Sequence, residues 1–583
     1  MTTDATTPLA VHDAASWDAV EPVLAELSER EIADADAAAA WMIERGEIEA
    51  TIDEAGSLIY INMTCDTGDE EAASTYRAYL EGFVPKIKPV NFALNRKQAE
   101  LCARFELTIG RHEVIARDTT ADVQLFRDEN VPLETELSTL GQDYQTINGA
   151  MSVDFDGQMR TMPQMGPYLE RTDRSVRESA YRAIVSRRLQ DADKIDDLYT
   201  KQIGLRHTVA KNAGFDDFIG YTFKAKHRFD YGPEHCRAFH DAVEKEVMPL
   251  AATLDAQRKA DLGVDELRPW DLAVDPKGRE PLRPFDGGAD LVSKTRAVMR
   301  ALDPKLSELF ESMGDGSNDR GVRTGANLDL DSRSGKAPGG YQAMLHARRE
   351  PFIFMNAAGL HRDVETMVHE AGHAFHSMLC SDETLYHYRE YPIEIAEVAS
   401  MAMELLTMQH WGVEGGFYPD AGNLARAQRK QLEGSVLTLA WVATIDAFQH
   451  WVYANPGHSP ADRRAAWLDL ESRFGVRSSR VSWPEDLTEW QGRTWHAQLH
   501  LFEVPFYYIE YGIAQLGALG LWLKSLEEGE AAALEAYRAA LRLGGSRPLP
   551  ELFGAAGLAF DFGAETVGRL VERVSVELAK LPS

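Results

Sequence analysis

The stretch Val368–His373 reads VHEAGH, an H-E-x-x-H pattern with His369, Glu370 and His373. Apolar residues recur around it at three- and four-residue steps: Val364, Met367, Val368, Ala371, Phe375, Met378 and Leu379. This spacing predicts an amphipathic helix on which the two histidines are one turn apart and face the same way. Both imidazoles can then reach one tetrahedral zinc ion. Glu370 is rotated away from that face, where it can accept a proton from a metal-activated water.

A catalytic zinc site needs a third protein ligand. His376 is a poor candidate because it lies about 10 Å beyond His369 along the helix axis, at about 1.5 Å per residue. The next predicted helix, residues 393–409, offers Glu394, Glu397 and Glu404. Glu394 and Glu397 share a helix face, and so do Glu397 and Glu404, so spacing alone does not choose among them.

Composition restricts the class of protein. The chain has 583 residues, of which 44% are hydrophobic and 26% are charged, and its formal net charge is −31. A globular, mostly helical protein is expected from this composition. The acidic balance disfavours nucleic acid and anionic membrane surfaces as partners.

The cysteines and the apolar runs indicate a compartment. The four cysteines lie far apart and form no C-x-x-C pair, which is typical of buried thiols in a reducing cytosol. The first residues lack the basic and apolar regions of a signal peptide, and no run of eighteen apolar residues occurs. We therefore expect a cytoplasmic protein that does not bind a membrane.

The order of the patterns along the chain predicts two parts. Helical periodicity begins at Trp17, and a short hairpin is expected around residues 151–159, which suggests an N-terminal helical lobe at 1–155 and a catalytic region at 156–583. Within the lobe, prolines 85 and 89 and Asn91 are expected to break a helix that starts near residue 70 and resumes at 95–105. A helical hairpin is expected at 172–213.

Three strand-like segments precede the motif helix, at 328–331, 341–346 and 351–356. We therefore expect a small sheet beside the motif helix. One of its edge strands could hold an extended peptide by backbone hydrogen bonds, or the sheet could serve only a structural purpose; both interpretations stay open.

Several motifs together resemble the M3 family of zinc peptidases, and most closely its oligoendopeptidase F branch. The matching segments are HEAGHAFH at 369–376, IAEVAS at 395–400, GKAPGGY at 335–341, residues 351–356, residues 495–512 with PFYYIEY at 505–511, and GGS at 544–546. The resemblance spans about residues 170–580 and is far more specific than H-E-x-x-H alone.

The resemblance implies a role for individual residues. Glu397 corresponds to the third zinc ligand, which leaves Glu394 and Glu404 as supporting or structural residues. His500 corresponds to a histidine beyond the zinc helices. Tyr508 and Tyr511 best match tyrosines that bind substrate and the oxyanion, with Tyr507 as a competing alignment. The chain departs from some relatives at Ile509, where they carry tyrosine.

The resemblance also implies a fold and a function. The expected fold is a mainly α, gluzincin-type shell of helices around a deep central channel, with the small sheet beside the zinc helix. The expected enzyme holds one Zn²⁺ and hydrolyses short, unstructured peptides internally, with Glu370 as general base. The glycine-rich loop at 335–340 is a candidate lid over the cleft.

Two other functions fit the same residues. A carboxypeptidase or dipeptidase would need a cation for the terminal carboxylate, for which Arg348, Arg349 and Arg389 are available. A non-catalytic peptide-binding protein would use the channel without chemistry, although the intact Glu370 argues against it.

Overall fold

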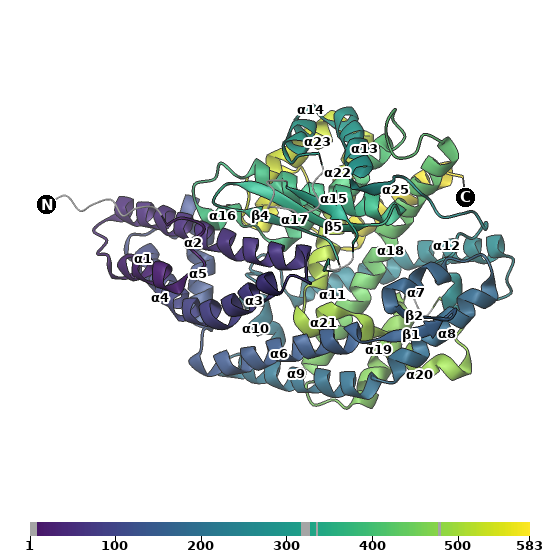
Figure 1. Ribbon diagram of the computed structural model, residues 1–583, viewed down its shortest axis with the longest axis horizontal. Coiled ribbons are helices and arrows are strands. Elements are labelled where there is room, and N and C mark those ends of the chain that lie inside the picture. The colour runs from purple at the N-terminus through teal and green to yellow at the C-terminus, as the bar shows by residue number, and fades with distance from the viewer. Residues whose placement is uncertain (1–8, 316–326, 334–335, 338, 476–479, 583) are drawn as a thin grey trace.

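The computed structural model describes residues 9–315, 327–333, 336–337, 339–475 and 480–582, and it is mainly α-helical (Figure 1). The expected helical shell is confirmed. Gly335 and Pro338 of the predicted lid loop lie outside the described residues. Within the described ranges, none of the helices combines the length and apolar character needed to cross a membrane.

The N-terminal part is a separate bundle, drawn in purple in Figure 1. Its helices are α1 (Trp17–Glu29), α2 (Ala35–Cys65), α3 (Glu70–Ala78), α4 (Val84–Arg104) and α5 (Glu113–Leu125). Their buried side chains form a core of their own, which only Leu385 and Tyr388 join from later in the chain.

The predicted helix break near residue 85 is wrong. A π-helical turn, Tyr79–Phe83, connects α3 directly to α4, which runs through Pro89 and Asn91 without interruption. Pro85 lies in the first turn of α4, where its missing N–H would have no helical partner in any case.

The middle of the chain forms the lower half of the molecule in Figure 1. Its elements are α6 (Val131–Gly149), β1 (Ser152–Phe155), β2 (Gln158–Thr161), α7 (Met162–Leu169), α8 (Arg174–Leu189), α9 (Ala192–Asn212), α10 (Phe218–Ala225), α11 (Pro233–Ala242) and α12 (Met248–Leu262). The β1–β2 hairpin and the α8–α9 helical hairpin confirm two sequence predictions. Helix α6 packs on α9 and α21, and Tyr144 stacks on Phe502, so this helix joins the main core. The predicted boundary at residue 155 stays a prediction.

A three-stranded sheet lies beside the motif helix, as expected. The elements of this region are α13 (Gly287–Leu302), α14 (Pro304–Ser312), β3 (Leu328–Asp331), β4 (Tyr341–Leu345), β5 (Glu350–Ala357), α15 (His361–Leu379), α16 (Tyr386–Arg389) and α17 (Ile393–Thr407). The strand order is β3–β5–β4, with β3 parallel and β4 antiparallel to the central β5. Helix α15 packs against β5 and β4.

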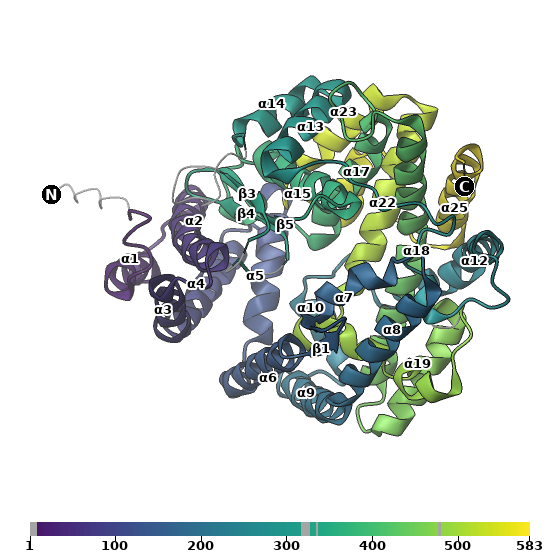
Figure 2. The ribbon, with the colours of Figure 1, turned by 45° about the vertical axis from the view of Figure 1, so that its right-hand side comes forward.

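The C-terminal helices complete the main core around α15 and α17. They are α18 (Ala421–Ala454), α19 (Pro460–Phe474), α20 (Thr488–Gln491), α21 (Leu499–Glu503), α22 (Tyr508–Glu527), α23 (Glu530–Leu541), α24 (Leu549–Ala555) and α25 (Ala564–Lys580). Figure 2 shows α17 and α22 above α6 and α9, with α18 to the right of α22. Helices α15, α17 and α22 therefore bring distant parts of the sequence together, because each packs on the next.

Candidate metal centre

The glycine in the H-E-x-x-H motif allows α15 and α17 to approach closely. A Cβ atom at Gly372 would lie 2.5 Å from the carbonyl oxygen of Ala399 and 2.6 Å from the Cα of Ser400, both on α17. These distances are shorter than atoms tolerate, so only glycine fits. The contact places the two histidines of α15 beside Glu397 of α17.

Three donor atoms from these two helices converge. Nε2 of His369 lies 3.4 Å from Oε2 of Glu397, and Nε2 of His373 lies 3.7 Å from the same oxygen. The ligand atoms of all three residues lie within 4.8 Å of one another. Donors that bind one tetrahedral zinc at about 2.0–2.2 Å are roughly 3.4 Å apart, so this spacing fits a single ion.

Glu404 fixes the ring of His369. Its Oε1 lies 2.7 Å from Nδ1 of His369, and its Oε2 accepts a hydrogen bond of 2.8 Å from Gln431. A carboxylate that binds Nδ1 leaves Nε2 directed at a metal. The sequence signal for this contact was the spacing of seven residues between Glu397 and Glu404, which puts both on one helix face, but spacing did not separate ligand from partner.

The carboxylate of Glu397 is also held in place. Its Oε2 accepts a hydrogen bond of 3.1 Å from Ser400, and its Oε1 accepts one of 3.3 Å from the hydroxyl of Tyr507. Glu394, by contrast, accepts a hydrogen bond of 2.7 Å from Tyr231 and is not part of the donor cluster. The geometry thus brings Glu397 to the histidines, rather than Glu394.

Glu370 belongs to the motif helix, and its carboxylate lies beside the edge strand β4. Its side chain is buried, and a Cβ at Gly340, just before β4, would be 3.9 Å from its Oε1. Burial raises the pKa of Glu370 to about 7, which a backbone hydrogen bond from Gln342 partly opposes. A carboxylate with such a pKa can both accept and release a proton near neutrality.

Burial and charge act differently on the two histidines. Although burial disfavours the imidazolium, the hydrogen bond to Glu404 and the charge of Glu397 raise the pKa of His369 to about 9. Burial and the neighbouring His369 charge hold the pKa of His373 well below its usual range. Burial also raises the pKa of Glu397. A dication at the centre would displace the His369 proton and satisfy the carboxylate.

The predicted histidine and tyrosines gather at the start of α22. The ring of His500 is 5.0 Å from that of Tyr508 and 6.0 Å from that of Tyr511, and the rings of Tyr507 and Tyr511 are 5.0 Å apart. Nδ1 of His500 lies 2.9 Å from the amide nitrogen of Gln498. Tyr507 reaches Glu397, so this cluster borders the metal centre.

The turn that directly precedes these tyrosines has a strained backbone. Phe506 has φ of 62°, a left-handed conformation that is uncommon for a residue with a side chain. Its N–H donates to Oε1 of Gln449 at 2.6 Å, and its carbonyl accepts a hydrogen bond from Arg228. Arg228 also binds Glu510 at 2.7 Å, so one arginine fixes both sides of the turn.

The remaining candidates of the sequence lie outside the centre. His376 is fully buried, about two turns along α15 from His369, and its ring stacks on that of Tyr391 with the ring centres 3.5 Å apart. Arg348 pairs with Glu54, and Arg349 and Arg389 both pair with Glu47, so all three arginines bind carboxylates of α2.

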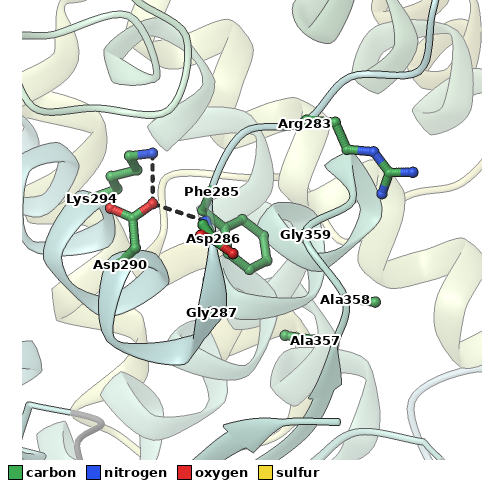
Figure 3. A pocket seen from close by; sticks show the side chains of 9 residues that line it. All are labelled: Arg283, Phe285, Asp286, Gly287, Asp290, Lys294, Ala357, Ala358 and Gly359. Atoms are coloured by element: carbon green, nitrogen blue, oxygen red, sulfur yellow. Dashed lines mark hydrogen bonds and ion pairs between the residues drawn. The ribbon is translucent and has the colours of Figure 1, made fainter.

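A separate surface hollow of about 620 Å³ lies between the start of α13 and the β5–α15 connection (Figure 3). Asp290 there binds Lys294 at 2.8 Å and the backbone N–H of Asp286 at 3.0 Å. None of the donors of the metal centre lines this hollow.

Known proteins are similar to this chain in sequence and in fold. The model of Peptidase family M3 matches residues 168–567. The chain is 22% identical to the chromosomal oligoendopeptidase F of Lactococcus lactis subsp. cremoris over 475 residues, which cover 79% of this chain and 70% of that protein. It is 25% identical to oligopeptidase PepF of Bacillus subtilis (strain 168) over 322 residues, 53% of this chain and 44% of that protein.

A solved structure of PZ peptidase A with an inhibitor superimposes on 96% of this chain and 96% of its own, with a TM-score of 0.84 and 26% identity. The resemblance noted in the sequence is therefore confirmed by a family match over most of the chain, by full-length structural similarity, and by helices that bring the motif residues together. The chain belongs to peptidase family M3 and is a peptide-hydrolysing metallopeptidase.

Proposed function

We propose that this enzyme is a zinc-dependent endopeptidase that cleaves short, unstructured peptides at the centre formed by His369, His373 and Glu397. The observation that carries the proposal is the convergence of these three donors within 4.8 Å, with Glu370 beside them. Two imidazoles and one carboxylate form a ligand set typical of catalytic zinc.

The chain's own residues account for the proton movements. Zinc, when bound, supplies Lewis acidity that lowers the pKa of a water and polarises the scissile carbonyl. Glu370 accepts the proton of that water as its oxygen bonds to the carbonyl carbon, and then gives the proton to the departing amine as the C–N bond breaks. The balance of atoms is that of hydrolysis, with one water consumed for each peptide bond.

Tyrosine hydroxyls stabilise the negative oxygen that develops on the carbonyl. Tyr507 donates a hydrogen bond to Glu397, and Tyr508 and Tyr511, whose rings adjoin each other at the start of α22, are the proposed donors to substrate. Burial raises the pKa of Tyr511, so its hydroxyl stays protonated and able to donate at neutral pH. His500, between them, is proposed to position the peptide.

The edge strand β4 supports an extended substrate. It pairs only with β5 in its sheet, and Gln342 on it reaches Glu370. A peptide aligned with β4 would present a carbonyl next to the general base. The arginines that would favour a carboxypeptidase all pair with α2, so no contact of the described residues supports that alternative.

The test is Glu370→Gln, which keeps the shape of the side chain and removes the base. We expect zinc content equal to that of the wild type and peptide hydrolysis reduced at least 100-fold, the lower end of about 10²–10⁴ for acid–base catalysis. Glu365→Gln, on the same helix but facing His361, is the matched control and should keep activity. Substantial residual cleavage by Glu370→Gln would refute its role.

The substrate class needs a second measurement. Mass spectrometry of products from a peptide-length series, with free and amidated C-termini, should show internal cleavage that is insensitive to amidation and absent from folded proteins. Stepwise removal of terminal residues would indicate an exopeptidase instead.

A further inference from the structure

A second group of metal-type donors lies on α11 and α18. Cys236 and His240 are four residues apart on α11, and Asp446 and His450 are four residues apart on α18, so each pair shares one face of its helix. Cys236 and Asp446 are fully buried, and the side chain of His450 is 11% exposed. The two helices pack against each other, which makes the two pairs face one another.

Three of these donors also converge. The ligand atoms of Cys236, Asp446 and His450 lie within 4.8 Å of one another. Nε2 of His450 lies 3.4 Å from Oδ2 of Asp446, close to the separation of about 3.4 Å between two donors on one tetrahedral ion.

One oxygen of Asp446 has no partner among the residues that the structure describes. Oδ2 accepts a hydrogen bond of 2.8 Å from Nε2 of His240, but Oδ1 is buried and makes no hydrogen bond. A buried, unpaired carboxylate oxygen is costly, and native proteins rarely keep one without a ligand. His240 fixes the carboxylate in the way that outer hydrogen-bond partners orient metal ligands.

The charges of the group suit a divalent cation. A thiolate and a carboxylate supply two negative charges, and two neutral imidazoles add none, so a dication leaves the cluster neutral. The buried Arg228, whose charge also acts on Cys236, is paired with Glu510. Metal binding deprotonates a coordinating thiol, so the thiolate forms as the ion enters.

Aromatic rings lie next to the histidines of this donor group. The ring of His450 is 5.2 Å from that of Phe506 and 6.2 Å from that of Phe223, and His240 is 6.2 Å from Phe474. Such surroundings strengthen electrostatic attraction between an ion and its ligands.

We propose that Cys236, Asp446 and His450 bind a second, structural divalent metal ion of the zinc class, with His240 orienting Asp446. The sulfur, nitrogen and oxygen donors select a borderline ion such as Zn²⁺ or Co²⁺ and disfavour Mg²⁺ and Ca²⁺. The ion joins α11 to α18 next to the Phe506 turn, whose N–H is held by Gln449, the neighbour of His450. The site goes beyond the proposed peptidase chemistry and does not depend on it.

The test is metal analysis and cobalt spectroscopy of the full chain under reducing conditions. His369→Ala/His373→Ala removes two of the three donors of the first centre. After incubation with zinc and desalting, this variant should retain about one equivalent of zinc, the ion of the second site. With Co²⁺ it should show a sulfur-to-cobalt charge-transfer band, because only a thiolate ligand produces one.

Substitutions separate this site from adventitious binding by other thiols. Cys236→Ala should abolish the band, whereas Cys102→Ala, a buried thiol of the N-terminal lobe, should leave it unchanged. Should Cys236→Ala fail to fold, the wild type still decides the matter, since its cobalt form must show the band. A wild type without the band, or a double histidine variant without retained metal, would overturn the proposal and leave a hydrogen-bonded Asp446–His240 pair.

Discussion

The metal centre on α15 and α17 and the donor group on α11 and α18 use the same local geometry for different ends. Each places donors four residues apart on a helix and completes the set from a neighbouring helix. The first is bordered by Glu370, His500 and tyrosine hydroxyls. The second is enclosed by phenylalanine rings. Chemistry therefore depends on what surrounds the donors, and not on the donors alone.

The largest effect is expected from Glu397→Ala, which removes one of three ligands at the first centre. Zinc content should fall by one equivalent and peptide hydrolysis should be lost, because two imidazoles alone hold the ion weakly. The thiolate–cobalt band of the second site should persist. Unchanged metal affinity would move the ligand role to Glu404 or Glu394, and loss of the band would show that the two sites are coupled.

Substitutions of Tyr511 and Tyr507 should affect different properties of the enzyme, the first its turnover and the second its metal binding. Tyr511→Phe should lower kcat by about 10²–10³-fold at unchanged metal content, because one donor to the oxyanion is lost. Tyr507→Phe should instead weaken metal binding, since Tyr507 contacts Glu397. Steady-state kinetics together with metal titration would show which tyrosine donates to the oxyanion and which supports metal binding. If Tyr511→Phe left kcat unchanged, Tyr508 would be the donor.

Removal of the partner of His369 should have a smaller effect. Glu404→Gln replaces the charged acceptor of the Nδ1 proton, and we expect metal affinity to fall by about 10–100-fold. A competition assay with a chelator measures this affinity. Glu433→Gln, whose carboxylate pairs with Arg429 and lies outside the donor cluster, is the matched control. Equal affinities for the two variants would remove Glu404 from the centre.

One added methyl group should disturb the contact between α15 and α17. Gly372→Ala should lower the free energy of unfolding by about 1–3 kcal/mol, because the backbone of α17 must move. Gly434→Ala, at an open helical position, should not destabilise the protein. Urea denaturation compares the two variants, and a neutral Gly372→Ala would mean that α15 and α17 pack less tightly.

A pH-dependent effect is expected at a buried carboxylate that pairs with arginines instead of a metal. Although burial opposes its charge, hydrogen bonds from Arg174 and Arg177 hold the pKa of Asp271 below its usual range. A lowered folded-state pKa contributes stability that is present above the unfolded value of about 3.9 and is lost as the pH falls through the folded value. The stability difference between wild type and Asp271→Asn should therefore shrink in acid. A difference independent of pH would contradict the ion pair.

Sequence periodicity located the motif helix, the small sheet and the helical hairpin correctly because each is set by local hydrophobic spacing. It failed at Pro85 and Pro89, where proline was expected to end a helix that instead continues through a π-helical turn. There the packing of α4 within the N-terminal core outweighs the local tendency of proline to end a helix.

By itself, the sequence determined the H-E-x-x-H helix, and it predicted a zinc-type chemistry and, through family resemblance, the ligand role of Glu397. The tertiary structure alone decided that Glu404 holds His369, that Tyr507 reaches Glu397, and that Cys236 meets Asp446 and His450 across more than two hundred residues of chain. The reason is physical: spacing within a helix defines which side chains share a face, whereas only the packing of helices defines what that face meets.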